Sequence, residues 1–200
     1  MEGYTENIIP QELPPEEIIN DGLGLLVRRK RLYHGSGTKG ISRLNSAEET
    51  TVGDGIYFTS ESDKALGYAE RRSRTKKDGE PVVYWTEIEN MKFLDLRNPS
   101  NVFKILDDFK SVLIETKKQK NWPWNYEAVL ENAIKAISNH EVKNLKQITF
   151  SLGDVFTGFV KSLGYDGLIT IEGGEGEDVG EHDTYLVFDP GKVSELTVEQ

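Results

Sequence analysis

The spacing of apolar residues changes twice along this chain, from the alternation typical of strands to a helical period and back again. Before residue 98 the chain is rich in β-forming residues. It predicts a strand at residues 27–34, a turn followed by a short strand within residues 53–59, and strands at residues 81–88 and 92–96. One helix is expected between the second and third strands, from Ser60 to Arg72, with Ser60 or Ser62 as its N-cap.

Residues 98–163 instead repeat their apolar positions with the period of helices. Two further strands are expected after them, at residues 167–171 and 185–188. This order argues against alternating βαβ units and a doubly wound sheet. The chain therefore predicts one α+β domain over residues 21–200, with a helical insertion at about 98–163, preceded by a loosely ordered acidic arm at residues 1–20.

The net charge of −10 is concentrated at the two ends of the chain. Residues 1–20 contain five glutamates and no basic residue, and residues 172–200 contain nine acidic residues and a single lysine. The body between them is close to neutral, so charge alone gives no reason to expect nucleic-acid binding and does not exclude it.

The remaining composition excludes several classes of protein. No apolar run approaches the roughly 18–20 residues of a membrane span, and the acidic N-terminus resembles neither a secretory signal nor a transit peptide. Without cysteine the chain forms no disulfide, thiolate nucleophile or zinc–thiolate site. We expect a protein without a membrane partner that acts in a cytoplasm, its own or that of a cell into which it is delivered.

One glycine motif is misleading. Residues 35–40 match G-x-G-x-x-G and follow a predicted strand. The dinucleotide fingerprint, however, requires these glycines to open a helix inside a βαβ unit, and no helix or parallel strand is expected here. A Rossmann site is therefore not predicted. The G-K-[ST] motif of a P-loop is also absent.

His34, Gly35 and Ser36 form the first candidate site. A single histidine in this position is more commonly a strand-end residue before a turn. The alternative is recognition of a planar amide, because a glycine without a side chain lets the backbone come close to a ligand. A neighbouring hydroxyl and imidazole then provide hydrogen bonds to a carboxamide and to a ribose hydroxyl.

Tyr57 and Tyr68 form the second candidate site, with ten residues between them. Two tyrosines on a strand and the following helix are more commonly part of a core. A pair of rings also stacks on a flat ligand, and each such contact contributes about 0.5–1.5 kcal/mol beyond the buried area.

Considered together, four segments resemble one known family: LYHGS at 32–36, GIYFTS at 55–60 with Tyr68, GYDGL at 164–168 and TYLVFDPGKV at 184–193. They resemble the ADP-ribosyltransferases of the diphtheria-toxin and poly(ADP-ribose) polymerase branch, and most of all the domains of phage and mobile-element polyvalent proteins. The resemblance implies a split, strongly bent antiparallel sheet around an NAD cleft, with NAD as co-substrate and no metal.

The same resemblance assigns roles to the candidate residues. His34 is expected to bind a ribose hydroxyl of NAD, and both His34 and Tyr57 are expected to contribute to catalysis. Gly35 and Ser36 are expected to hold the nicotinamide carboxamide, and Tyr57 and Tyr68 to stack on the nicotinamide ring. Ala65 stands where many polymerase-type members have a serine that contacts the amide.

The sequence departs from the polymerase pattern at the position of the catalytic acid, where Thr184 replaces the usual glutamate. A carboxylate is needed because cleavage of the N-glycosidic bond develops an oxocarbenium-like cation at the ribose. In mobile-element members the acid is expected upstream, and here Glu175 before Gly176 is the first candidate. The alternatives are Glu181, Glu172 and Asp183, or a solvated Gly/Glu loop without a catalytic role.

The resemblance therefore implies a mono-ADP-ribosyltransferase that moves ADP-ribose from NAD to a macromolecular acceptor, protein or nucleic acid, as a toxin or phage effector. Two alternatives remain open. An NAD glycohydrolase uses water as the acceptor and releases free ADP-ribose. A catalytically inactive module binds NAD or another nucleotide without releasing nicotinamide, an alternative that Thr184 suggests.

Overall fold

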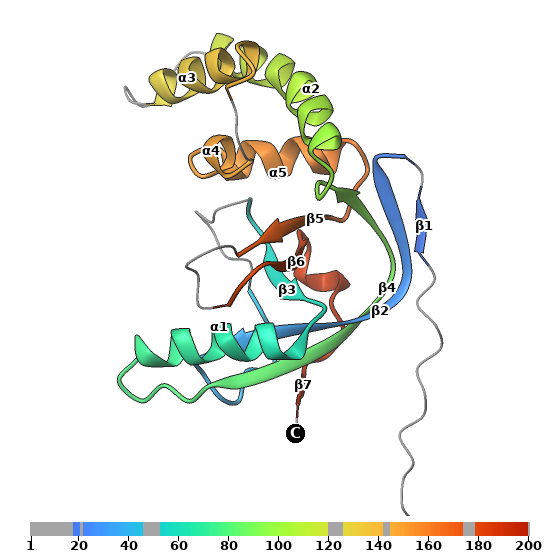
Figure 1. Ribbon diagram of the computed structural model, residues 1–200, viewed down its shortest axis with the longest axis vertical. Coiled ribbons are helices and arrows are strands. Elements are labelled where there is room, and N and C mark those ends of the chain that lie inside the picture. Colours follow the sequence, from blue (N-terminus) through green and yellow to red (C-terminus); the bar gives the residue numbers. More distant parts are fainter. Residues whose placement is uncertain are drawn as a thin grey trace, which may run out of the picture.

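The computed structural model describes residues 18–20, 22–45, 53–119, 126–141, 145–173 and 179–199 (Figure 1). Its strands are β1 (Ile18–Asn20), β2 (Gly24–Ser36), β3 (Ile56–Thr59), β4 (Val82–Asp95), β5 (Gly167–Glu172), β6 (His182–Val187) and β7 (Thr197–Val198). Its helices are α1 (Ser62–Arg74), α2 (Pro99–Lys118), α3 (Tyr126–Ser138), α4 (Lys146–Thr149), α5 (Gly153–Ser162) and the 3-10 turn η1 (Pro190–Lys192). The expected α+β class and the helical insertion are confirmed. In the part of the chain that is described, none of the helices has the length and apolar character to cross a bilayer.

The long strands β2 and β4 form a strongly curved ribbon along one side of the molecule (Figure 1). Their antiparallel pairing keeps one register from Gly24 opposite Leu94 to Ser36 opposite Val82. Asn90 adopts a left-handed backbone with φ of 51°, which asparagine tolerates better than most residues. The strand continues through this polar position, so the expectation of two separate strands at 81–88 and 92–96 is wrong.

The sheet closes on itself. Beyond the β2–β4 ribbon, β2 pairs with β3, β3 with β6, β6 with β5 and β5 with β4. The link between β2 and β3 rests on Tyr33 opposite Thr59, so the two strands separate just after it. The pairing of β4 with β5 is parallel, because α2 to α5 carry the chain across the sheet between these strands. The expected bent, split sheet is present, with this parallel pair as its exception.

Two apolar cores occupy the two faces of this closed sheet. The inner core takes one face of β2 to β6 and includes Phe58, Phe93 and Tyr185. The outer core lies between the sheet and the helical insertion, and it joins Phe109 of α2 to Leu186 of β6. Because successive side chains of a strand point to opposite faces, the outer face of β6 carries His182, Thr184 and Leu186.

The single helix α1 covers the other part of the outer face, at the end of β2 (Figure 1). Its buried side chains are Ala65 and Ala69, which allow the helix to approach the strand closely. The N-cap is Glu61 without a side-chain capping bond, so the expected caps Ser60 and Ser62 are wrong. The Thr59 hydroxyl instead accepts a hydrogen bond from the Glu61 amide at 3.2 Å.

The expected N-terminal arm is described only at its end. Residues 18–20 form β1, which pairs antiparallel with Leu25 to Val27 of β2. This part of the arm is therefore ordered against the domain, and the expected boundary at residue 20 falls at the last residue of a strand. Residues 1–17 lie outside the described residues.

Candidate functional site

His34 lies where β2 separates from β3. Its Nδ1 is 2.8 Å from the backbone carbonyl oxygen of Tyr57, and its ring packs edge-on against Phe58. A carbonyl accepts a hydrogen bond and does not donate one, so Nδ1 carries the proton. In the neutral imidazole, Nε2 is then an acceptor and suits a ribose hydroxyl as donor. The tautomer that the proposed role requires is thus fixed by the backbone of β3.

The environment of His34 lowers its pKa from the ordinary value of 6.5. Burial is the largest cause, the hydrogen bond to Tyr57 opposes it, and the positive charge of Arg72 adds to the lowering. As the pH falls to about 6.5, His34 is protonated in the unfolded chain but remains neutral in the folded protein. The contribution of His34 to the free energy of unfolding is therefore present above that pH and is lost as the pH falls.

We expect the His34→Gln variant to show a weaker loss of stability on acidification than the wild type. Between pH 7.5 and 5.5, His34 contributes a decline in the free energy of unfolding of at most about 1.4 kcal/mol per pH unit. Glutamine retains an N–H donor for Tyr57 but does not titrate. Urea unfolding of both proteins at three pH values measures the difference, and parallel pH profiles would contradict it.

Gly35 and Ser36 are buried beneath α1. A Cβ added at Gly35 would lie 1.9 Å from the carbonyl oxygen of Ala65 and 2.7 Å from the amide nitrogen of Ala69. The glycine is thus required by helix packing, a reason that the sequence argument did not include. The Ser36 hydroxyl accepts a hydrogen bond from the Thr38 amide at 3.1 Å. Binding of the nicotinamide carboxamide by these two residues stays a prediction.

Tyr57 and Tyr68 occupy different environments. Tyr57 is half-buried against the outer core, and its hydroxyl donates to the carbonyl oxygen of Gly53 at 2.9 Å. Tyr68 lies on α1, where the guanidinium of Arg71 stands 5.0 Å from the centre of its ring. The ring of Tyr68 also packs edge-on against His182, at 5.5 Å between centroids. Their expected stacking on nicotinamide stays a prediction.

A chain of polar contacts runs from Tyr68 across the outer face of the sheet. The Tyr68 hydroxyl is 3.3 Å from Nε2 of His182, and the Thr184 hydroxyl is also 3.3 Å from that nitrogen. The Thr184 hydroxyl donates to Oε2 of Glu172 at 3.2 Å. Nδ1 of His182 is 2.8 Å from the carbonyl oxygen of Gly180, which fixes the tautomer. We call Tyr68, His182, Thr184 and Glu172 the polar chain.

One arrangement of protons satisfies the polar chain. With Nδ1 of His182 donating to Gly180, Nε2 offers a single lone pair, which the Tyr68 hydroxyl takes. The Thr184 proton then goes to Glu172, since an ionised carboxylate only accepts. All three side chains on the sheet are buried: His182, Thr184 and Glu172. Polar groups inside a protein are nearly always hydrogen-bonded, and these contacts provide the partners.

The helical insertion also reaches this site. Nζ of Lys146, the first residue of α4, is 3.9 Å from Oε1 of Glu172. Sequence reasoning assigned no role to Lys146 or to His182. His182 had a usable signal, because it is two residues before Thr184 on a strand and so shares its face. Lys146 had none, because no sequence pattern joins it to Glu172.

The three candidate acids that the structure describes have different surroundings. Asp183 points to the opposite face of β6 from Thr184 and forms an ion pair with Arg97 at 2.6 Å. Arg97 also binds Asp95: burial alone raises the pKa of Asp95, but the hydrogen bonds and charge of Arg97 outweigh it and lower that pKa. Glu181 is exposed. Glu172 belongs to the polar chain, and Glu175 lies outside the described residues.

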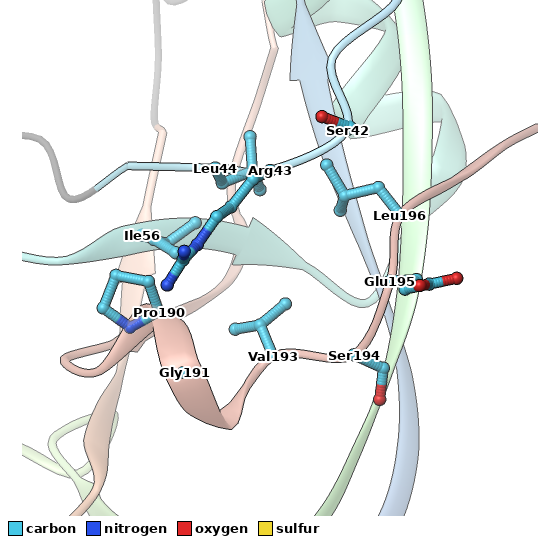
Figure 2. Close-up of a pocket in the computed structure, with 10 residues that line it drawn as sticks. All are labelled: Ser42, Arg43, Leu44, Ile56, Pro190, Gly191, Val193, Ser194, Glu195 and Leu196. Carbon is cyan, nitrogen blue, oxygen red and sulfur yellow. The ribbon is translucent and has the colours of Figure 1, made fainter.

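Two hollows lie away from the predicted residues. Figure 2 shows the first, about 250 Å³ in volume, where Arg43 extends beside Ile56 and Pro190. The second, about 430 Å³, is lined by residues around Asp166 and Lys192. None of His34, Tyr57, Tyr68 and Glu172 lines either hollow. Over the described ranges, no group of three or more His, Asp or Glu side chains is placed to hold a metal ion.

The arrangement around α1 and β6 suits a nucleotide sugar. The polar chain combines an aromatic ring on α1 with a buried carboxylate on β5, and the imidazole acceptor of His34 lies at the end of β2. A carboxylate close to a sugar stabilises positive charge that develops at the anomeric carbon more than it stabilises the ground state. These are the groups that cleavage of an N-glycosidic bond requires.

Comparison with known proteins identifies the family of this domain. A chain of the M. tuberculosis MbcT–MbcA toxin–antitoxin complex has a similar structure, with a TM-score of 0.42, 12% sequence identity, and coverage of 90% of this chain and 87% of that one. Among curated proteins, none matches significantly. The family described as ADP-ribosyltransferase in polyvalent proteins matches residues 28–199. The chain therefore belongs to this family of ADP-ribosyltransferase domains.

Proposed function

We propose that this domain transfers ADP-ribose from NAD to a macromolecular acceptor, as a toxin or phage effector. The observation that carries the proposal is the polar chain, which places a buried carboxylate, a threonine hydroxyl and the Tyr68 ring on one face. The tautomer of His34, with Nε2 as acceptor, supports a contact between His34 and a ribose hydroxyl. Membership of a family of ADP-ribosyltransferase domains supports NAD as the co-substrate.

The reaction needs no general acid for departure. The bond between the ribose C1′ and the pyridinium nitrogen breaks, and its electron pair returns to the ring, so nicotinamide leaves neutral. The acceptor then donates an electron pair to C1′ from the opposite face, and its own proton passes to solvent. The protein orients the ribose and stabilises the positive charge at C1′.

Release of nicotinamide from NAD, measured with and without a cell extract, tests the proposal. We expect release together with label from adenine-labelled NAD on protein or nucleic acid. Free ADP-ribose without labelled macromolecule would identify an NAD glycohydrolase instead. NAD binding without any release would identify a binding module, the alternative that Thr184 favours because a threonine carries no negative charge.

A further inference from the structure

We infer that Glu172 is the catalytic carboxylate of this domain, delivered from β5 to the place where β6 carries Thr184. The inference rests on the proposed reaction with NAD. It differs from the sequence-based expectation, which put Glu175 first. In this assignment Thr184 is a positioning residue that holds the glutamate of the neighbouring strand.

The strand register brings the two residues together. Thr184 pairs with Thr170 of β5, and Glu172 pairs with His182 of β6. Directly opposite residues of an antiparallel pair share a face, and so do residues two apart on one strand. Glu172, His182 and Thr184 therefore all lie on the outer face, and the 3.2 Å bond from the Thr184 hydroxyl to Oε2 of Glu172 spans this diagonal.

The surroundings of Glu172 are those of a built site and not of a solvated loop. The residue is 8% exposed although it is the last of its strand. Lys146 contributes a positive charge 3.9 Å from Oε1, and the polar chain links Oε2 through Thr184 and His182 to Tyr68.

The other two described candidates for the catalytic acid, Asp183 and Glu181, do not lie buried beside Thr184. Asp183 is directed to the opposite face and paired with Arg97, and Glu181 is exposed. A glutamate at position 184 would place its carboxylate on the same face as Thr184. Here the carboxylate comes from Glu172 on the neighbouring strand, and the Thr184 hydroxyl donates a hydrogen bond to it. The carboxylate then accepts the hydrogen bond of the 2′-hydroxyl next to C1′ and stabilises the cation as the bond to nicotinamide breaks.

Glu172→Gln removes the charge but keeps an acceptor oxygen. We expect its kcat for nicotinamide release to fall about 100-fold or more, with a Kd for NAD within about threefold of the wild type. Glu115→Gln makes the same change on the exposed face of α2 and serves as the matched control, with turnover expected to be that of the wild type. Thr184→Val is expected to lose about tenfold in kcat, and Thr184→Ser to recover it. Wild-type turnover in Glu172→Gln, or its loss in Glu175→Gln alone, would overturn the assignment.

A second measurement is independent of turnover. Glu172→Ala should weaken binding of NAD about tenfold in calorimetry, because a hydrogen bond to a charged group is lost. It should leave unchanged the binding of an NAD analogue without the 2′-hydroxyl on the nicotinamide ribose. Since both ligands meet the same variant, any general disturbance cancels in the ratio. Equal weakening for both would refute the role of Glu172, even if the wild type releases nicotinamide as proposed. Selective weakening would support it, even if the wild type proves inactive.

Discussion

Replacing Gly35 with alanine is expected to lower the free energy of unfolding by about 3 kcal/mol and to abolish reaction with NAD. The added Cβ would lie 1.9 Å from the carbonyl oxygen of Ala65 and 2.7 Å from the amide nitrogen of Ala69. Both atoms belong to the backbone of α1, so no side chain can rotate away. The helix must move, and Tyr68 moves with it away from His182. Urea unfolding and nicotinamide release measure the two effects.

Gly158→Ala is the matched control for this prediction. Gly158 is on the exposed face of α5, and a Cβ added there meets no atom within 4 Å. Alanine in a helix is favoured over glycine by up to about 1 kcal/mol, so this variant should be as stable as the wild type or slightly more stable. If Gly35→Ala were to unfold at the same urea concentration as Gly158→Ala, the close approach of α1 to β2 would be wrong.

Phe109→Ala is expected to cost about 4 kcal/mol in the free energy of unfolding. Phe109 is fully buried in the outer core, with its ring centre 5.1 Å from that of Phe156 and 5.3 Å from that of Phe159. Truncation removes the ring contacts and leaves a cavity between α2 and α5. Because the same core includes Leu168 and Leu186 of the sheet, the whole domain should lose stability in one transition. Urea unfolding followed by fluorescence and circular dichroism tests both points.

Phe103 provides the control on the same helix, since it is 47% exposed. Phe103→Ala should change the free energy of unfolding by less than about 1 kcal/mol. Two separate transitions in Phe109→Ala would show instead that the helical insertion unfolds independently of the sheet.

The fold class and most elements follow from the spacing of apolar residues, because alternation and helical period reflect which faces are buried. The exception in β4 has a local cause. Glu89 and Asn90 interrupt the apolar pattern, but backbone pairing with β2 on both sides holds the strand through them. The spacing of apolar residues indicates which side chains are buried, but it does not indicate which backbone groups are hydrogen-bonded.

Sequence patterns pointed to candidate site residues where these lie in one short segment, and their roles stay predictions. His34, Gly35, Tyr57 and Tyr68 belong to local motifs. Glu172 was only one alternative among four, because it adjoins a Gly/Glu stretch that has the composition of a solvated loop. Its burial depends on pairing with β6 and on Lys146 of α4, which are long-range contacts. No short pattern encodes them.

The polar chain depends on a strand, β6, that is synthesised after both of its neighbours in the sheet. β6 lies between β3 and β5, although it follows both of them in the chain. A chain translated only as far as β5 contains both neighbours of β6 but neither His182 nor Thr184. The ring of strands closes only when β6 emerges, and the polar chain is complete only then. A chain that ends before β6 therefore lacks the polar chain on which the proposed reaction depends.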